Sequence, residues 1–245
     1  MSPRLFVAAL AAVLLIPSVA ARTAIASEGD VECAGFGFDP NAPIAVYEVT
    51  QAQKQLNFVK SRSEGPSCPS NAAACRMRAY IMPADVVVVA STRNGFACAG
   101  YRGLKGGYTF GWLPAAGLQE LTPISNPTAA DWVGNWQRAE ATIAIKSAPK
   151  GQIAISAEGT YGAFVKEMVA RGNVRSGTFA ATIKPTGDRL TFTDGDEGKA
   201  TFATDGSCRV RMWLVQATRG KRLIVEDDTQ CGGMGMSFTG VYEAK

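Results

Sequence analysis

Short segments rich in β-branched and aromatic residues recur from Ala45 to the C-terminus, separated about every ten residues by turns rich in Gly, Pro, Asn and Asp. This spacing is typical of antiparallel strands and predicts an all-β fold. The clearest interruption is the segment 122–130, where Pro123 and Pro127 lack the amide hydrogen that a strand ladder needs. We therefore predict two β domains, at residues 27–121 and 131–245, joined by a linker at residues 122–130.

The N-terminal residues 1–26 have the layout of an export signal. Arg4 precedes an apolar run at residues 5–19, and small residues suited to cleavage follow, so we expect cleavage after Ala26. The apolar run is shorter than a membrane span, and no later run approaches the ~20 residues that a spanning helix needs. We therefore expect a periplasmic or secreted protein whose mature form has no membrane span.

Six cysteines follow this signal, and the chain has no histidine. In an oxidising compartment, an even number of cysteines favours disulfides over thiol chemistry or metal binding. The C-terminal half holds two cysteines, which are expected to pair with each other. The other four allow three pairings, and we favour one local loop closure and one link from the N-terminal segment to a core strand. The favoured disulfides are Cys208–Cys231, Cys68–Cys75 and Cys33–Cys98.

The number and distribution of charged residues exclude some classes of function. Basic and acidic residues number 8 and 8 in residues 27–130, and 15 and 13 in residues 131–245, and they are interleaved. Neither half has the basic stripe that nucleic acid binding requires, so nucleic acid is not an expected partner. Without histidine, the commonest general base and the commonest metal ligand are missing. We expect a protein that is not an enzyme and that uses no cofactor or metal.

The first half resembles a bacterial SH3-type domain. The resemblance rests on Leu56-Asn57-Phe58, the strand 85–89, the turn at Asn94-Gly95-Phe96, the segment Gly111-Trp112-Leu113 and the closing Leu118, and it covers residues 44–121. It implies an SH3-like small barrel, and such modules in exported bacterial proteins commonly hold cell-wall peptide or act as adapters. The sequence departs from the family between Leu56 and Asp85, where an insertion carries Cys68 and Cys75.

Aromatic residues of this half are candidate ligand contacts for a peptide or glycan. Alternation along the strand that follows the turn places Phe96 and Cys98 on one face and Tyr101 on the other. Aromatic residues in a small barrel usually belong to the core, so only some of them are expected at the surface. The three that we expect to be exposed contacts are Tyr101, Tyr108 and Trp112.

The second half resembles the small calycin-type barrels, the lipocalin and avidin group, because Gly134-Asn135-Trp136 opens a series of about eight strands. The resemblance implies a disulfide-bonded antiparallel β-barrel with one buried and one solvated face. Trp136 is expected to plug the closed end rather than to contact a ligand. Between two strands, residues 163–171 have helical periodicity and end at Gly172, which predicts a short helix covering the barrel.

Three other patterns have a chemical and a structural interpretation, and the structural one is favoured in each. Ser147 and Lys150 match a serine acyl-enzyme motif, but Pro149 and Gly151 favour a hairpin turn. The second pattern is an acidic cluster, which is interpreted as a solvated turn rather than as a calcium loop or the carboxylate pair of a hydrolase. The third is a pair of methionines beside a glycine, which is interpreted as a packed turn rather than as a copper site. These residues are Asp188, Asp194, Asp196, Glu197, Met234 and Met236.

Together these features predict an exported, non-catalytic binding protein of the bacterial envelope that contacts cell-wall peptide or an envelope protein. The alternative is a periplasmic inhibitor of a lysozyme or protease, or a small-ligand carrier, that works through the C-terminal barrel. The residues indicate neither the ligand nor the oligomeric state.

Overall fold

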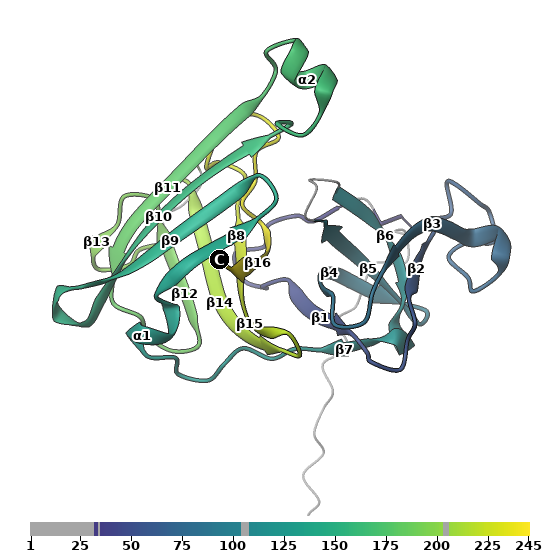
Figure 1. Ribbon diagram of the computed structural model, residues 1–245, viewed down its shortest axis with the longest axis horizontal. Coiled ribbons are helices and arrows are strands. Elements are labelled where there is room, and N and C mark those ends of the chain that lie inside the picture. The colour runs from purple at the N-terminus through teal and green to yellow at the C-terminus, as the bar shows by residue number, and fades with distance from the viewer. Residues whose placement is uncertain (1–31, 34, 104–107, 203–205) are drawn as a thin grey trace, which may run out of the picture. The chain divides into compact units, whose positions relative to one another are not determined.

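The computed structural model describes residues 32–33, 35–103, 108–202 and 206–245, so the expected export signal at residues 1–26 lies outside the described residues. Residues Val31–Lys245 form one compact unit. Within this unit the strands belong to two curled sheets (Figure 1). The predicted all-β fold is confirmed.

The first sheet has seven strands among the described residues, and its neighbouring strands are antiparallel. Their order across the sheet is β3-β2-β6-β5-β4-β1-β7. Between β4 and β5, Asn94 and Gly95 adopt φ values of 49° and 81°, which is the conformation that a tight hairpin turn needs. The strands are β1 (Ala45–Val49), β2 (Leu56–Val59), β3 (Arg76–Ile81), β4 (Val86–Arg93), β5 (Phe96–Arg102), β6 (Tyr108–Pro114) and β7 (Leu118–Glu120).

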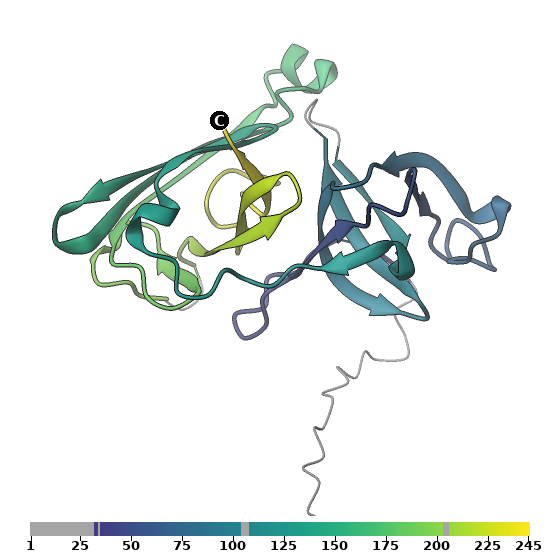
Figure 2. The same cartoon turned by 60° about the horizontal axis from the view of Figure 1, so that its bottom comes forward.

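The second sheet has nine strands among the described residues, in the order β12-β14-β15-β16-β8-β9-β10-β11-β13. It is curled and keeps two edges, β12 and β13, so the expected barrel of about eight strands is a half-barrel of nine strands among the described residues (Figure 2). The strands are β8 (Gly134–Arg138), β9 (Ala141–Ala148), β10 (Gln152–Tyr161), β11 (Arg175–Ile183), β12 (Arg189–Thr193), β13 (Glu197–Gly198), β14 (Arg209–Ala217), β15 (Gly220–Asp227) and β16 (Gly240–Ala244).

Each sheet encloses its own apolar core, and a third apolar cluster joins the two sheets. In this third cluster, Val46 and Val88 of the first sheet pack with Trp213, Val215 and Ile224 of the second. The expected alternation of buried and solvated residues therefore fails in β14 and β15, where the neighbours of the core-facing residues are buried as well. The physical reason is that the outer face of these strands is covered by the first sheet instead of water.

The three disulfides are Cys33–Cys98, Cys68–Cys75 and Cys208–Cys231, which are the pairs favoured from the sequence. The first two lie in one cluster with Val59, Phe96 and Trp112 of the first sheet. This small cluster lies on the face of the sheet opposite to the main core. Cys33–Cys98 ties the N-terminal segment to β5, whereas Cys68–Cys75 closes a loop within the insertion.

The two α-helices are short. In α1 (Ala129–Trp132), Thr128 and Asp131 form a reciprocal capping box, and Trp132 is buried in the core of the second sheet. The second helix, α2 (Lys166–Ala170), confirms the helix expected near residues 163–171, and Gly172 follows it with a φ of 65°. None of its residues is buried, so the expectation that it covers the barrel is wrong. Among the described residues, no helix has the length and apolar character required to cross a bilayer.

Asp131 makes the stability of this region sensitive to acid. Hydrogen bonds from Thr128 and then from Lys221 lower the pKa of Asp131 from an ordinary 3.8 to about 2. Because the folded chain binds this proton less readily than the unfolded chain, the contribution is complete above about pH 4 and is lost as the pH falls through about 2.

We expect Asp131→Asn to lower the urea midpoint at pH 6 and to leave it close to that of the wild type at pH 2. The measurement is a series of urea unfolding curves between these two pH values, with Asp188→Asn as the control at a partly exposed acidic residue whose only ion-pair partner among the described residues is Arg189, at 3.8 Å. A difference between wild type and Asp131→Asn that does not change with pH would contradict the assignment.

Candidate functional site

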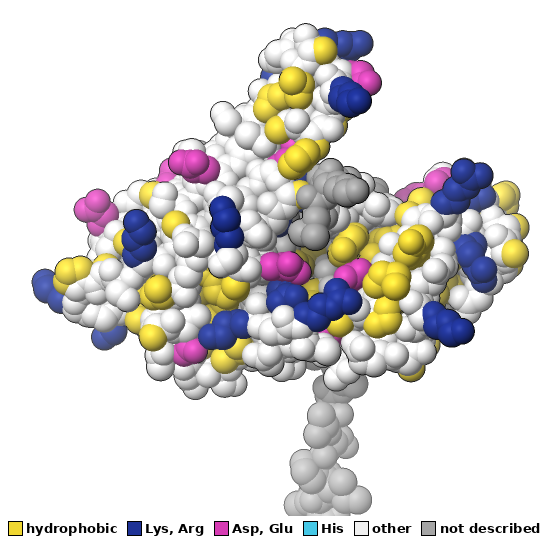
Figure 3. All heavy atoms as spheres, viewed as in Figure 1, with side chains coloured by type: hydrophobic (Ala, Val, Ile, Leu, Met, Phe, Trp, Pro, Cys, Tyr) yellow, Lys and Arg dark blue, Asp and Glu magenta, His cyan; other side chains and the backbone are white. Residues whose placement is uncertain are grey.

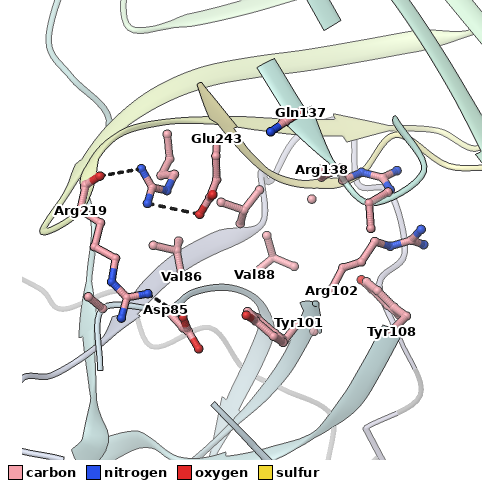
Figure 4. Close-up of a pocket in the computed structure, with 16 residues that line it drawn as sticks. Asp85, Val86, Val88, Tyr101, Arg102, Tyr108, Gln137, Arg138, Arg219 and Glu243 are labelled. Atoms are coloured by element: carbon pink, nitrogen blue, oxygen red, sulfur yellow. Dashed lines mark hydrogen bonds and ion pairs between the residues drawn. The ribbon is translucent and has the colours of Figure 1, made fainter. Parts of the chain in front are cut away.

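One cavity, of about 250 Å³, is lined by strands of both sheets (Figure 4). We call it the arginine cavity, because its charged lining consists of four arginines and two carboxylates, which gives a formal charge of +2. These residues are Arg102, Arg138, Arg219, Arg222, Asp85 and Glu243.

Three of the arginines have their guanidinium groups fixed by the protein. Arg219, in the tight turn between β14 and β15, donates to Asp85 Oδ1 at 3.1 Å and to the Pro83 carbonyl at 2.6 Å. Arg222 pairs with Glu243 at 3.3 Å and also donates to backbone carbonyls of the same turn.

Arg138, the third, lies on β8 and is almost fully buried. Its Nε donates to the Tyr242 hydroxyl at 3.0 Å, and its terminal nitrogens donate to the carbonyls of Ala139 and Ser237. It therefore acts as an immobile positive charge in the wall of the cavity.

Arg102, at the end of β5, is the arginine of the cavity that has hydrogen-bond donors without an acceptor among the described residues. Among the described residues, its guanidinium has one hydrogen-bond partner, Glu140 Oε2 at 2.9 Å, and its buried Nε has none. The guanidinium lies over the ring of Tyr108, 5.0 Å from the ring centre. Figure 4 shows Arg102 between Tyr108 and Arg138 at one side of the cavity.

The electrostatics of this corner favour an anion. Burial, and then the positive charge of Arg138, lower the pKa of Arg102, which means that the site destabilises its charged form. An anionic group placed beside the two guanidiniums would relieve this repulsion and would supply an acceptor for the unpartnered Nε. A carboxylate is such an acceptor, and its planar pair of oxygens matches a guanidinium.

A second cavity, of about 370 Å³, shares Arg102 and Tyr108 with the first. We call it the aromatic cavity, because its lining also includes Phe36, Phe38 and Phe110. The ring centres of Phe36 and Phe110 are 5.0 Å apart, and those of Tyr108 and Phe110 are 4.2 Å apart. A cationic cavity and an aromatic cavity thus adjoin at Arg102.

Two of the three aromatic residues expected to contact a ligand line the arginine cavity. Tyr101 and Tyr108 are half-buried there, and burial raises the pKa of each to about 12. Their hydroxyls therefore stay protonated at neutral pH, where they serve as hydrogen-bonding groups rather than as bases.

The expectation that Trp112 is an exposed contact is wrong. Its side chain is 2% exposed and packs against Phe96 and the two disulfides of the first sheet. The insertion that carries Cys68 and Cys75 contributes to the cluster around Trp112, so this part of the face is not open to a ligand.

The serine–lysine pattern and two members of the acidic cluster lie in or next to turns, as the structural interpretation predicted. Ser147 is the residue before the last in β9, and Lys150 lies in the turn before β10, with a positive φ of 60°. Asp194 accepts a hydrogen bond from the Ala180 amide, and Asp196 accepts several from Thr193 and Thr201.

The methionine and tryptophan candidates lie in different surroundings. Met236 is buried in the core of the second sheet, as the packed turn predicts, whereas Met234 is 90% exposed, so the expectation that it packs is wrong. Trp136 is buried in the same core and donates from Nε1 to the Trp132 carbonyl at 3.0 Å. Within the described ranges, no group of three or more Cys, Asp and Glu side chains is arranged to hold a metal.

The four arginines of the cavity were not among the site residues expected from the sequence. Arg102 and Arg138 are single basic residues in their strands, whereas Arg219 and Arg222 lie beside Lys221 in a short basic segment. The cavity forms because the packing of the two sheets brings β5, β8 and the turn before β15 together. The available signal was the position of Arg102 beside Tyr101, at the end of a strand whose other residues are apolar.

Comparison with known proteins gives no further assignment, because no family model, no curated protein and no solved structure matches this chain.

Proposed function

We propose that this chain is an exported, non-catalytic binding protein of the bacterial envelope, and that the arginine cavity receives the carboxylate of a cell-wall peptide. The observation that carries the proposal is Arg102, a mostly buried guanidinium with unused donors in a cavity of net positive charge. Cell-wall peptides carry free carboxylates, and the adjoining aromatic cavity offers a surface for the apolar part of the same ligand.

Two further observations support the envelope location and the fold family. Three disulfides are typical of proteins from oxidising compartments, in line with the export signal expected at residues 1–26. The SH3-type resemblance of residues 44–121 and the calycin-type resemblance of residues 131–245 belong to the same proposal, supported by the curled sheet that each region forms. SH3-type modules in exported proteins commonly bind wall peptide.

The proposal is tested by co-sedimentation of the mature chain, residues 27–245, with insoluble cell-wall sacculi. The diagnostic variant is Arg102→Met combined with Glu140→Gln, because Glu140 without its partner would be an almost buried, unpaired charge. We expect it to bind at least tenfold more weakly than the wild type, since hydrogen bonds to charged groups contribute roughly 1.5–3 kcal/mol each.

Two controls separate the cavity from general charge effects. Glu140→Gln alone keeps Arg102 and is expected to bind as well as the wild type. Lys150→Met removes a positive charge from the exposed turn before β10 and is also expected to bind normally. Sedimentation of the double variant at the wild-type level would contradict the proposed site. Failure of the wild type to sediment would contradict the wall peptide as ligand, and inhibition assays with lysozyme and proteases would follow.

A further inference from the structure

The hairpin of β10 and β11 ends in a compact tip whose residues are not part of the apolar core of the second sheet. Tyr161 at the end of β10 pairs with Arg175 at the start of β11, and α2 lies between them (Figure 1). The side chain of Met168 lies close over Gly162, so the tip is packed on itself. We call residues 161–175 the apolar tip.

The side chains of the apolar tip are unusually exposed for their type. Phe164 is 58% exposed, Val165 45% and Val169 52%, although the spacing of the same residues along the sequence led us to expect a covering helix. Met234, which is 90% exposed, lies in the neighbouring loop, where Gly235 lies close to the ring of Tyr161. Exposed apolar patches of this kind mark contacts with a partner or a membrane.

The charged residues of the apolar tip are mostly basic. Lys166, Arg171 and Arg175 are positive and Glu167 is negative, which gives a formal charge of +2. Among the described residues, none of these four forms an ion pair. Figure 3 shows hydrophobic and basic side chains together on the projecting arm at the top of the view, where Figure 1 places α2.

We propose that the apolar tip docks on an anionic phospholipid surface, with its exposed apolar side chains at the level of the headgroups. The charge is complementary to anionic headgroups, and exposed Phe and Val beside Lys and Arg are the combination by which interfacial segments bind membranes. No residue of the apolar tip lines the arginine cavity, but the two regions adjoin, because Tyr161 lines the aromatic cavity and the Ala163 amide donates to Glu140 Oε1 at 2.7 Å. The test therefore leaves Tyr161 and Ala163 unchanged.

The test is sedimentation of the full mature chain with phospholipid vesicles. One set contains phosphatidylcholine alone and the other contains phosphatidylcholine mixed with phosphatidylglycerol. We expect binding to the anionic vesicles that weakens at high salt and little binding to the neutral ones. Absence of binding to the anionic vesicles at low salt would overturn the inference.

Two variants separate the apolar and the charge contributions. Lys166→Gln with Arg171→Gln is expected to weaken binding roughly thirtyfold, at about fivefold per charge removed. Phe164→Ser with Val169→Ser is expected to lose most binding while keeping the wild-type thermal midpoint, because both side chains are exposed. Binding of this apolar variant at the wild-type level would also overturn the inference.

The matched control is Tyr80→Ser with Met82→Ser, which removes two exposed apolar side chains, one from β3 and one from the segment just after it. It is expected to bind anionic vesicles as the wild type does. Equal loss of binding in the Tyr80 and Met82 variant would show that exposed apolar area in general, and not the apolar tip, drives the association.

Discussion

Replacing Trp213 with alanine is expected to lower the free energy of unfolding by about 3–5 kcal/mol, the usual cost of truncating a buried tryptophan. The side chain of Trp213 is 1% exposed and packs between the sheets, against Val46 and Val88. Its removal leaves a void that neither sheet fills by moving alone, because both are held by their own cores.

Urea unfolding followed by far-ultraviolet circular dichroism measures this effect. The control is Gln216→Ala, an exposed position on the same strand, which is expected to change the stability by less than about 0.5 kcal/mol. A loss below about 1 kcal/mol for Trp213→Ala would show that the two sheets do not stabilise each other through this cluster.

Of the three disulfides, Cys33–Cys98 is expected to contribute most to the free energy of unfolding. This bond closes a loop with a sequence separation of 65, and the chain-entropy estimate for such a loop is about 4 kcal/mol. Replacing both cysteines with alanine is therefore expected to remove much of the ~5–15 kcal/mol by which a native protein is typically stable. Cys98 is also buried against Trp112, so the variant loses packing as well.

The matched comparison is the double alanine variant of Cys68 and Cys75, whose sequence separation is 7 and whose expected cost is about 2.5 kcal/mol. Urea midpoints of the two variants under oxidising conditions give the ranking. If the Cys68 and Cys75 variant were the less stable of the two, the tie between the N-terminal segment and β5 would not be the major covalent constraint. A large loss at Cys33–Cys98 would also support folding in an oxidising compartment.

Local signals in the sequence predicted local structure. Asn94 and Gly95 predict a tight turn because their short-range preferences suffice to form it, and Gly172 ends α2 for the same reason. Cys208 and Cys231 could be paired because no third cysteine competes in that half.

Features that depend on distant packing could not be predicted in this way. Alternation along β14 predicts one buried face, but Trp213 and Val215 on its other face are buried by the first sheet. Trp112 was expected to be an exposed aromatic contact, but it is buried in one cluster with both disulfides of the first half, Cys33–Cys98 and Cys68–Cys75. Arg102 beside Tyr101 is a local signal, but the arginine cavity as a whole could not be predicted from one segment, since Arg102 and Arg138 come from different sheets.

Calorimetric titration with soluble peptide stems released from sacculi addresses the proposed carboxylate site. The stems are titrated before and after chemical amidation of their carboxylates, into the wild type and into Arg102→Met with Glu140→Gln. We expect the wild type to bind the free acids at least tenfold more tightly than the amides, and the variant to lose this preference. Equal affinity of the wild type for acids and amides would contradict a carboxylate held by Arg102.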